Sequence, residues 1–276
     1  MYIYIIPHQG LGDILCTNGL IRYLIEMNPD AKKYYLFCID MHIKTARFQF
    51  RDLKKLKIIR ISNNEKTEQK EIENHIKKQN KEYEIIKIGH EFYNPSLNLN
   101  PYKKKYPWHC CVGFYKQFGL PYKLRFEKTF WKRDYKREKK LLKKLTKNDH
   151  NYVFVHDDIK RGIKIDTSKI SNKYKIIRND TRNLVFDYGL ILENAKELHF
   201  MESSFRQFTE TLKIKTKKLF LYKDDREDYS MPLYNKKTKK LIGTSRLWKE
   251  IKVKWNEKNF IKPHAPTEKK SKKSFF

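Results

Sequence analysis

The sequence predicts an α/β protein in which parallel strands alternate with helices in two successive halves. Three observations predict this class. The first 25 residues read as a strand, a glycine turn and an amphipathic helix. Short apolar runs and helical patterns then alternate along the chain. The alternation starts again after residue 150, so a second α/β unit is expected.

The opening unit is the stretch around which the rest is organised. Tyr2–Ile6 is a β-branched and aromatic run typical of a buried strand. The turn Gly10-Leu11-Gly12-Asp13 precedes a helical pattern of Ile14, Leu15, Leu20, Ile21, Leu24 and Ile25. Gly10 and Gly12 are expected to take positive φ and to let another molecule approach the backbone. Asp13 is expected to be the N-cap. A tight turn without a ligand explains the same residues.

The remainder of the first half continues the pattern. Three further strands are expected, at Tyr34–Ile39, Lys57–Ile61 and Glu84–Ile88. Between the last two, Glu65–Lys81 is either an exposed helix or a long loop. A helix is expected from Pro107 to Gly119. Its Trp108 and His109 either line an acceptor pocket or pack in the core, and packing is the commoner use of such aromatics.

The second half repeats the architecture after a linker at Leu120–Arg133. The expected helices are Asp134–Leu145, Asp187–Lys196 and Ser203–Leu212, and the expected strands are Tyr152–Val155, Tyr174–Ile177, Leu198–Phe200 and Leu219–Tyr222. A closing helix is expected to hold Trp248 and Trp255. The resulting division is a Rossmann-like domain at 1–130, a second Rossmann-like domain at 131–260, and a disordered basic tail at 261–276.

Composition bounds the class of protein. The formal net charge of +30 invites a nucleic-acid interpretation. Only 13 of the 62 basic residues are arginines, however, and Asn, Ile and Tyr are also frequent, which is what an AT-rich coding sequence produces. Codon drift on solvated faces is therefore favoured over a dedicated nucleic-acid surface.

Cysteine spacing and hydropathy predict the compartment. The four cysteines, Cys16, Cys38, Cys110 and Cys111, show no C-x-x-C spacing, which indicates a reduced cytoplasmic protein without a zinc site. No apolar run approaches the roughly 20 residues needed to span a bilayer. The first apolar run is too short for a signal peptide.

Two more polar clusters follow predicted strands of the second half. His156 and Asp157 end one strand and are followed by Lys160-Arg161-Gly162, where a fixed charge suits a diphosphate. His199 lies in a later strand, and Glu202-Ser203-Ser204 opens a helix that offers free amides and hydroxyls to a phosphate. Plain helix capping and surface salt bridges explain each cluster singly. Together the clusters favour a ligand site more than any one of them does, because ligands of open α/β sheets bind beyond the carboxyl ends of the strands.

The turn at Gly10–Asp13 and the stretch Glu197–Phe205 resemble GT-B glycosyltransferases, most nearly the heptosyltransferase-like group and related small enzymes of bacterial and large-virus genomes. The resemblance covers roughly residues 1–225. It implies two Rossmann-like domains facing a cleft, with the acceptor on the N-terminal domain and a nucleotide sugar on the other. A Lys-x-Trp-Pro-like element is absent after Asp158. Arg161-Gly162 stands there, as in fucosyltransferase-like enzymes.

The resemblance implies roles for individual residues. Asp13 is implied to be the base, and Arg161, with Lys160 second, to steady the leaving diphosphate. The residues expected to bind the donor or its phosphates are Gly10, Gly12, His156, Lys160, Arg161, His199, Glu202, Ser203 and Ser204. The residues expected on the acceptor side are His8, Trp108 and His109.

The predicted function is therefore glycosyl transfer from a nucleotide sugar to a glycan or other hydroxyl acceptor, without a metal or other cofactor. A basic tail that contacts an anionic surface is a possible further partner interaction. Two alternatives remain open. One is a nucleic-acid-binding protein that uses its lysine-rich surface, and the other is a GT-B fold that binds a nucleotide or glycan without turnover.

Overall fold

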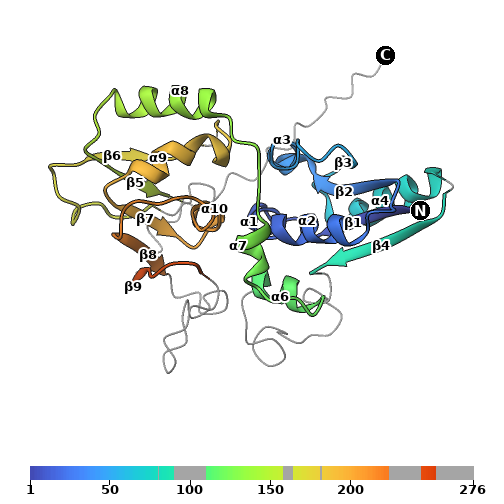
Figure 1. Ribbon diagram of the computed structural model, residues 1–276. Coiled ribbons are helices and arrows are strands. Elements are labelled where there is room, and N and C mark those ends of the chain that lie inside the picture. The colour runs from blue at the N-terminus through green and yellow to red at the C-terminus, as the bar shows by residue number, and fades with distance from the viewer. Residues whose placement is uncertain (80, 90–109, 158–163, 181, 224–243, 253–276) are drawn as a thin grey trace, which may run out of the picture.

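The computed structural model contains two parallel sheets with helices packed against them (Figure 1). It describes residues 1–79, 81–89, 110–157, 164–180, 182–223 and 244–252. The expected α/β class with two Rossmann-like halves is confirmed. Within the described part, no helix is both long enough and apolar enough to cross a membrane.

The first sheet has the strand order β3-β2-β1-β4, and all its strands are parallel. Its strands are β1 (Tyr2–Pro7), β2 (Lys33–Ile39), β3 (Leu56–Ile61) and β4 (Tyr83–Ile88). Period-two alternation sends Ile3 and Ile5 of β1 to one face, and Tyr4 and Ile6 to the other. Because both faces are covered, β1 is apolar along its whole length, as expected of a central parallel strand.

The helices of the first half cover both faces of this sheet. They are α1 (Leu11–Cys16), α2 (Asn18–Met27), η1 (Asp40–His42), α3 (Ile43–Gln49), α4 (Glu65–Gln79), α6 (Cys110–Lys116) and α7 (Leu124–Lys128). Leu20 and Ile21 of α2 pack on the face that carries Ile3, whereas Ile72 and Ile76 of α4 pack on the face that carries Tyr4. The segment Glu65–Lys81 is therefore mainly helix.

The second sheet has the order β6-β5-β7-β8-β9, again parallel throughout. Its strands are β5 (Tyr152–His156), β6 (Lys175–Arg178), β7 (Leu198–Met201), β8 (Leu219–Lys223) and β9 (Lys249–Lys252), and its helices are α8 (Tyr135–Thr146), η5 (Val185–Tyr188), α9 (Gly189–Asn194) and α10 (Ser204–Thr209). One face, through Phe154 and Phe200, packs against these helices, and the other, through Val153 and Val155, packs against Ile165.

Helices α8 and α10 both begin with a side-chain N-cap, which at Ser203 is one of the two uses expected from sequence. Asp134 is the N-cap of α8, and its side chain accepts from the backbone N–H of Arg137 at 3.1 Å. Ser203 is the N-cap of α10 and accepts from the backbone N–H of Arg206.

Three expectations about local structure are wrong. The opening helix is not continuous, because the backbone at Thr17 (φ −83°, ψ 0°) separates α1 from α2. The expected linker at Leu120–Arg133 contains α7, whose backbone packs on α2 at Gly19. The residue that was expected in a closing helix, Trp248, instead leads into strand β9.

The side chain of Trp248 explains why a strand forms there. Its indole packs on Phe200 and donates Nε1–H to the buried Glu210 carboxylate at 2.8 Å. These contacts place the chain beside β8, where backbone pairing extends the sheet. Trp255, the basic tail and the start of the helix expected at Pro107 lie outside the described residues.

A histidine lies within the aromatic cluster between α4 and the first sheet. The His75 ring makes edge contacts with Tyr4, Tyr35 and Phe37 at centroid distances of 5.6 to 6.3 Å. Burial lowers the pKa of His75 below its ordinary 6.5, and the positive charges of Lys57 and Lys78 lower it further. The folded protein therefore holds this ring neutral more strongly than the unfolded chain does.

This predicts that acid destabilises the fold through His75. Below an ordinary pKa of 6.5 the unfolded chain binds a proton that the folded state resists, so stability is full above that pH and falls as pH drops through the folded pKa. Urea unfolding of the wild type should show lower stability at about pH 5.5 than at about pH 7.5. His75→Phe should reduce this difference, whereas His150→Gln, a change at an exposed histidine, should not. Equal pH dependence in the wild type and His75→Phe would refute the assignment.

Candidate active site

Each sheet has one place where the chain reverses its direction of winding, between two neighbouring strands. In the first sheet this place lies between β1 and β4, because β2 and β3 extend the sheet on the other side of β1. His8 follows β1 directly, and Gly89 follows β4. The backbone N–H of His8 donates to the carbonyl of Ile88 at 3.0 Å, which ties the two strand ends together. Ligands of open α/β sheets bind at such reversal points.

In the second sheet the reversal lies between β5 and β7. His156 is the last residue of β5, and Glu202 and Ser203 follow β7. The imidazole of His156 stacks on the Phe205 ring of α10, with centroids 4.5 Å apart. Three residues that were predicted to bind the donor therefore gather at this edge.

Helices α1 and α10 bring the two reversal points together, as Figure 1 shows at the centre of the molecule. A Cβ atom placed on Gly12 would lie 3.9 Å from Ser204 Cα and 3.9 Å from Gln207 Cγ. The thiol of Cys16 donates to Gln207 Oε1 at 3.2 Å. The glycine turn and the serine turn, almost 200 residues apart, thus lie in contact at the junction of the halves.

The glycine turn holds a histidine–carboxylate pair. His8 Nδ1 and Asp13 Oδ2 are in hydrogen-bond contact, with the side chains 30% and 15% exposed. Both groups are therefore partly open to solvent. A Cβ on Gly10 would overlap the Asp13 carboxylate, so a residue without a side chain is needed there for the pair to form.

This geometry corrects two expectations about the turn. Asp13 does not cap α1; the N-cap is Gly10, and Asp13 lies in the first helical turn with its carboxylate directed to His8. Neither Gly10 nor Gly12 has positive φ, and Gly10 is extended at φ −66°, ψ 144°. The two glycines serve close packing, Gly10 beside the Asp13 carboxylate and Gly12 beside α10.

The Glu202 carboxylate is held by a buried network. Its Oε1 accepts from Arg206 Nε at 2.8 Å and from Gln207 Nε2 at 3.1 Å. Arg206 is 1% exposed and also pairs with Glu210 at 3.1 Å. Burial acts to raise the pKa of Glu210, but Arg206 and the donors Ser245 and Thr244 outweigh it and keep the pKa below its usual value. Glu202 is thus fixed in orientation at the start of α10.

A second network, at Arg125, joins the halves and was missed by sequence reasoning. The guanidinium of Arg125 is fully buried and donates to the carbonyl of Gln207 at 2.8 Å and to the Tyr122 hydroxyl. Beside it, the thiol of Cys111 donates to that of Cys16 at 2.7 Å. No local pattern indicated this arrangement, because Arg125 was expected in a linker.

His199 is not brought into the cluster. It lies inside β7, stacked on Phe220 at 4.6 Å, with its Nδ1 3.0 Å from the Tyr222 hydroxyl and its Nε2 3.3 Å from Glu197. Burial lowers the pKa of His199, and Glu197 opposes this only in part. These contacts assign the imidazole to packing and hydrogen bonding on the strand.

Asp157, directly after β5, is tied to Ile165 and Arg178. Its carboxylate is buried, pairs with Arg178 and accepts from the backbone N–H of Ile165 at 2.8 Å. It therefore anchors the two ends of the segment 158–163. That segment, with Lys160 and Arg161, lies outside the described residues, and so do Trp108 and His109.

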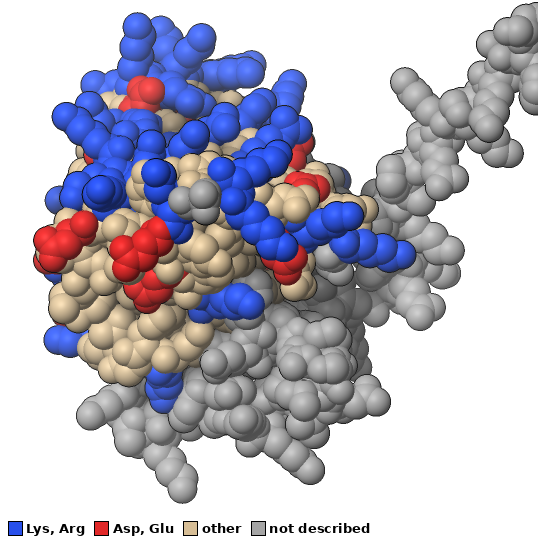
Figure 2. All heavy atoms as spheres, turned by 90° about the vertical axis from the view of Figure 1, so that its right-hand side faces the viewer, with Lys and Arg blue, Asp and Glu red and all other residues tan. Residues whose placement is uncertain are grey.

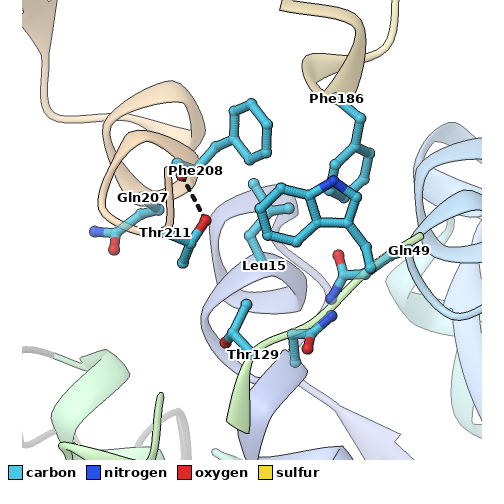
Figure 3. Close-up of a pocket in the computed structure, with 9 residues that line it drawn as sticks. Leu15, Gln49, Thr129, Phe186, Gln207, Phe208 and Thr211 are labelled. Atoms are coloured by element: carbon cyan, nitrogen blue, oxygen red, sulfur yellow. Dashed lines mark hydrogen bonds between the residues drawn. The ribbon is translucent and has the colours of Figure 1, made fainter. Parts of the chain in front are cut away.

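The cavity behind the α1–α10 contact is too small for a substrate. It has a volume of about 10 Å³, and its lining includes Leu15, Gln49, Thr129, Phe186 and Phe208 (Figure 3). Two buried atoms that face it, Gln49 Oε1 and Thr129 Oγ1, have no hydrogen-bond partner. This volume and these two atoms suit one water molecule. Across the described ranges, no three His, Cys, Asp or Glu side chains are grouped to hold a metal ion.

Comparison with solved structures identifies the fold. Over 92% of this chain and 86% of the other, the structure is similar to the glycosyl transferase family 9 protein from Veillonella parvula DSM 2008, with a TM-score of 0.55 and 9% sequence identity. The chain has a GT-B-type fold. E. coli ADP-heptose lps heptosyltransferase II aligns over 92% of this chain and 90% of its own, with a TM-score of 0.47 and 9% identity. Neither a protein-family model nor a curated protein sequence matches the chain.

Two glycines at the same position of successive helices should respond differently to alanine. Gly12 and Gly19 are each the second residue of their helix. A Cβ on Gly12 meets atoms at ordinary van der Waals distance, so Gly12→Ala should be neutral or stabilise by up to about 1 kcal/mol. A Cβ on Gly19 would lie 2.9 Å from the carbonyl oxygen of Leu124, so Gly19→Ala should destabilise by about 1–3 kcal/mol.

Urea unfolding of both variants measures the difference. A loss of stability in Gly12→Ala as large as that in Gly19→Ala would show that α1 and α10 are packed more tightly than described.

Proposed function

We propose that this protein transfers a sugar from a nucleotide-activated donor to a hydroxyl group of a glycan or other acceptor, without a bound metal. In this proposal residues 1–130 take the acceptor and residues 131–260 take the donor. The observation that carries it is the contact of the two sheet reversal points, where Gly12, the neighbour of Asp13 in the glycine turn, packs on Ser204 of the serine turn. The GT-B-type fold supports it, since glycosyl transfer is the activity named for the similar Veillonella protein.

The His8–Asp13 pair is the proposed base. A neutral imidazole that donates Nδ1–H to Asp13 carries its lone pair on Nε2. The acceptor hydroxyl proton then passes to Nε2 as the oxygen attacks the anomeric carbon, and the Asp13 carboxylate stabilises the imidazolium that forms. Asp13, which the resemblance implied to be the base, is in this mechanism the residue that orients the histidine and stabilises its protonated form.

The donor side must absorb the negative charge of the departing nucleoside diphosphate. Arg161 and Lys160 are proposed for this role, because the anchored Asp157 sets the start of their loop at the β5 end. Ser203 and Ser204 are the proposed phosphate contacts. Glu202, fixed by Arg206, is the proposed acceptor of hydrogen bonds from the ribose.

Ligand binding tests the proposal without knowledge of the acceptor. A panel of nucleoside diphosphates and nucleotide sugars should include at least one that raises the melting temperature. A ligand at a hundred times its Kd stabilises the native state by about 2.7 kcal/mol. Arg161→Ala should lower the affinity for that ligand and leave the melting temperature of the free protein unchanged. Stabilisation by oligonucleotides and by no nucleotide would overturn the transferase proposal.

Asp13→Asn should lower kcat by about 10²- to 10⁴-fold, because an amide cannot stabilise the imidazolium. Gly10→Ala should act in the same direction, since its Cβ displaces the carboxylate. Asp30→Asn, the same change at an exposed turn residue, is the control and should leave kcat unchanged. Turnover of the donor with each acceptor found, measured across pH, provides the readout. A kcat for Asp13→Asn within about twofold of wild type would exclude the pair as the base.

A further inference from the structure

Helix α8 carries an uninterrupted positive face on the outside of the molecule. Its apolar residues Leu141, Leu142 and Leu145 pack on the core of the second half. The basic residues exposed on its opposite side and at its end are Lys136, Arg137, Lys139, Lys140, Lys143, Lys144 and Lys147. The one acidic residue within α8, Glu138, is 2% exposed and paired with Arg133. The solvated face of this helix therefore carries positive charge alone.

Codon drift does not explain this segregation, because another exposed helix of the same chain lacks it. Helix α4 contains four lysines and four glutamates in 15 residues, so its formal charge is zero. Helix α8 contains six basic residues and one acidic residue in 12. A general excess of lysine would give both helices a similar positive net charge. Helix α8 therefore carries an excess of positive charge that α4 does not.

The positive face continues onto the first half of the molecule. Arg51 donates to the carbonyl of Lys132, and the guanidinium groups of Arg51 and Arg137 both lie over the Phe48 ring, at 3.7 and 5.4 Å. Lys44 and Arg47 of the neighbouring helix α3 are also exposed. In Figure 1, α3 and α8 lie along one side of the molecule. Figure 2, which views the molecule from the end of the first half, shows lysine and arginine side chains gathered over the upper part of that view.

The chemistry of this surface favours lipid headgroups over nucleic acid. Six of the seven basic residues of the α8 face are lysines, and the one arginine is engaged by Asp187 at 2.7 Å. Lysine is a mobile point charge that needs no fixed geometry, whereas nucleic-acid sites use arginine forks and aromatic rings that stack on bases. The Phe48 ring is covered by two guanidinium groups and by Phe186 at 5.1 Å, so it offers no stacking surface.

We propose that the α8 face, with Arg51, Lys44 and Arg47 beside it, is a docking surface for an anionic lipid bilayer. The helix lies along the outer edge of the second half, and its lysines are exposed to solvent. Because its leucines are committed to the core, binding is electrostatic and peripheral, and it weakens as salt screens the charges. This inference does not depend on glycosyl transfer.

Vesicle flotation of the full chain tests the proposal with a matched pair of variants. The test variant is Lys140→Glu with Lys144→Glu on α8, and the control is Lys66→Glu with Lys70→Glu on α4. Both pairs are exposed, spaced by four residues and equal in charge change. The wild type and the control should float with vesicles that contain phosphatidylglycerol and not with phosphatidylcholine alone. The α8 variant should bind at least about tenfold more weakly.

Three results would overturn the proposal. One is equal weakening in the two variants, which would show that net charge alone drives binding. Another is full binding by the α8 variant. The third is an oligonucleotide of equal phosphate concentration that removes the wild type from vesicles and binds the α8 variant poorly, which would assign the surface to nucleic acid. Lys140→Gln with Lys144→Gln, a milder change, repeats the test if the glutamate variant fails to fold.

Discussion

The contact between α1 and α10 is the interaction on which the rest of the structure depends. Gly12 lies against Ser204 and Gln207, and Leu15, one turn further along α1, is buried in the hydrophobic core of the second half. A residue of the first half thus completes the core of the other. Because both helices begin at a sheet reversal point, the same packing that joins the halves also sets the two loops opposite each other.

The side of α10 away from this contact is secured by buried charge. Glu210 accepts from Arg206, Thr244, Ser245 and Trp248. Removal of one partner of such a network leaves a buried charge uncompensated, which commonly costs about 3–5 kcal/mol. The short helix α10 therefore has a fixed position, and so has the Glu202 side chain at its start.

Much of the fold could be predicted from local patterns. The strands at Tyr2–Ile6 and Tyr152–Val155 are apolar along their length because both faces of a parallel sheet are covered, and this marks them in the sequence. The helical patterns that begin at Asp134 and Ser203 located α8 and α10 correctly, and each of these residues is the N-cap of its helix.

The features that the sequence did not reveal depend on partners far along the chain. Trp248 forms no helix because Glu210 and Phe200 hold it. Asp13 was expected to cap its helix, besides the base role implied by the resemblance, because helix capping is the local use of an aspartate after a glycine turn. No local rule selects His8, five residues earlier, as its partner. The role of Arg125 in joining the halves was not predicted, because its partner Gln207 lies 82 residues away in the sequence.

The crossing between the halves has a mechanical consequence. The side-chain amide of Asn18 in α2 donates to the backbone carbonyl of Phe130 and accepts from the backbone N–H of Phe130, each at 3.0 Å. The next residue, Trp131, is buried in the core of the second half. Two residues later, Arg133 forms ion pairs with Glu138 and Glu193. The chain is therefore held by side-chain contacts on both sides of the point where it passes from one half to the other. A rotation of one half relative to the other would therefore bend the described chain at the Phe130–Trp131 peptide.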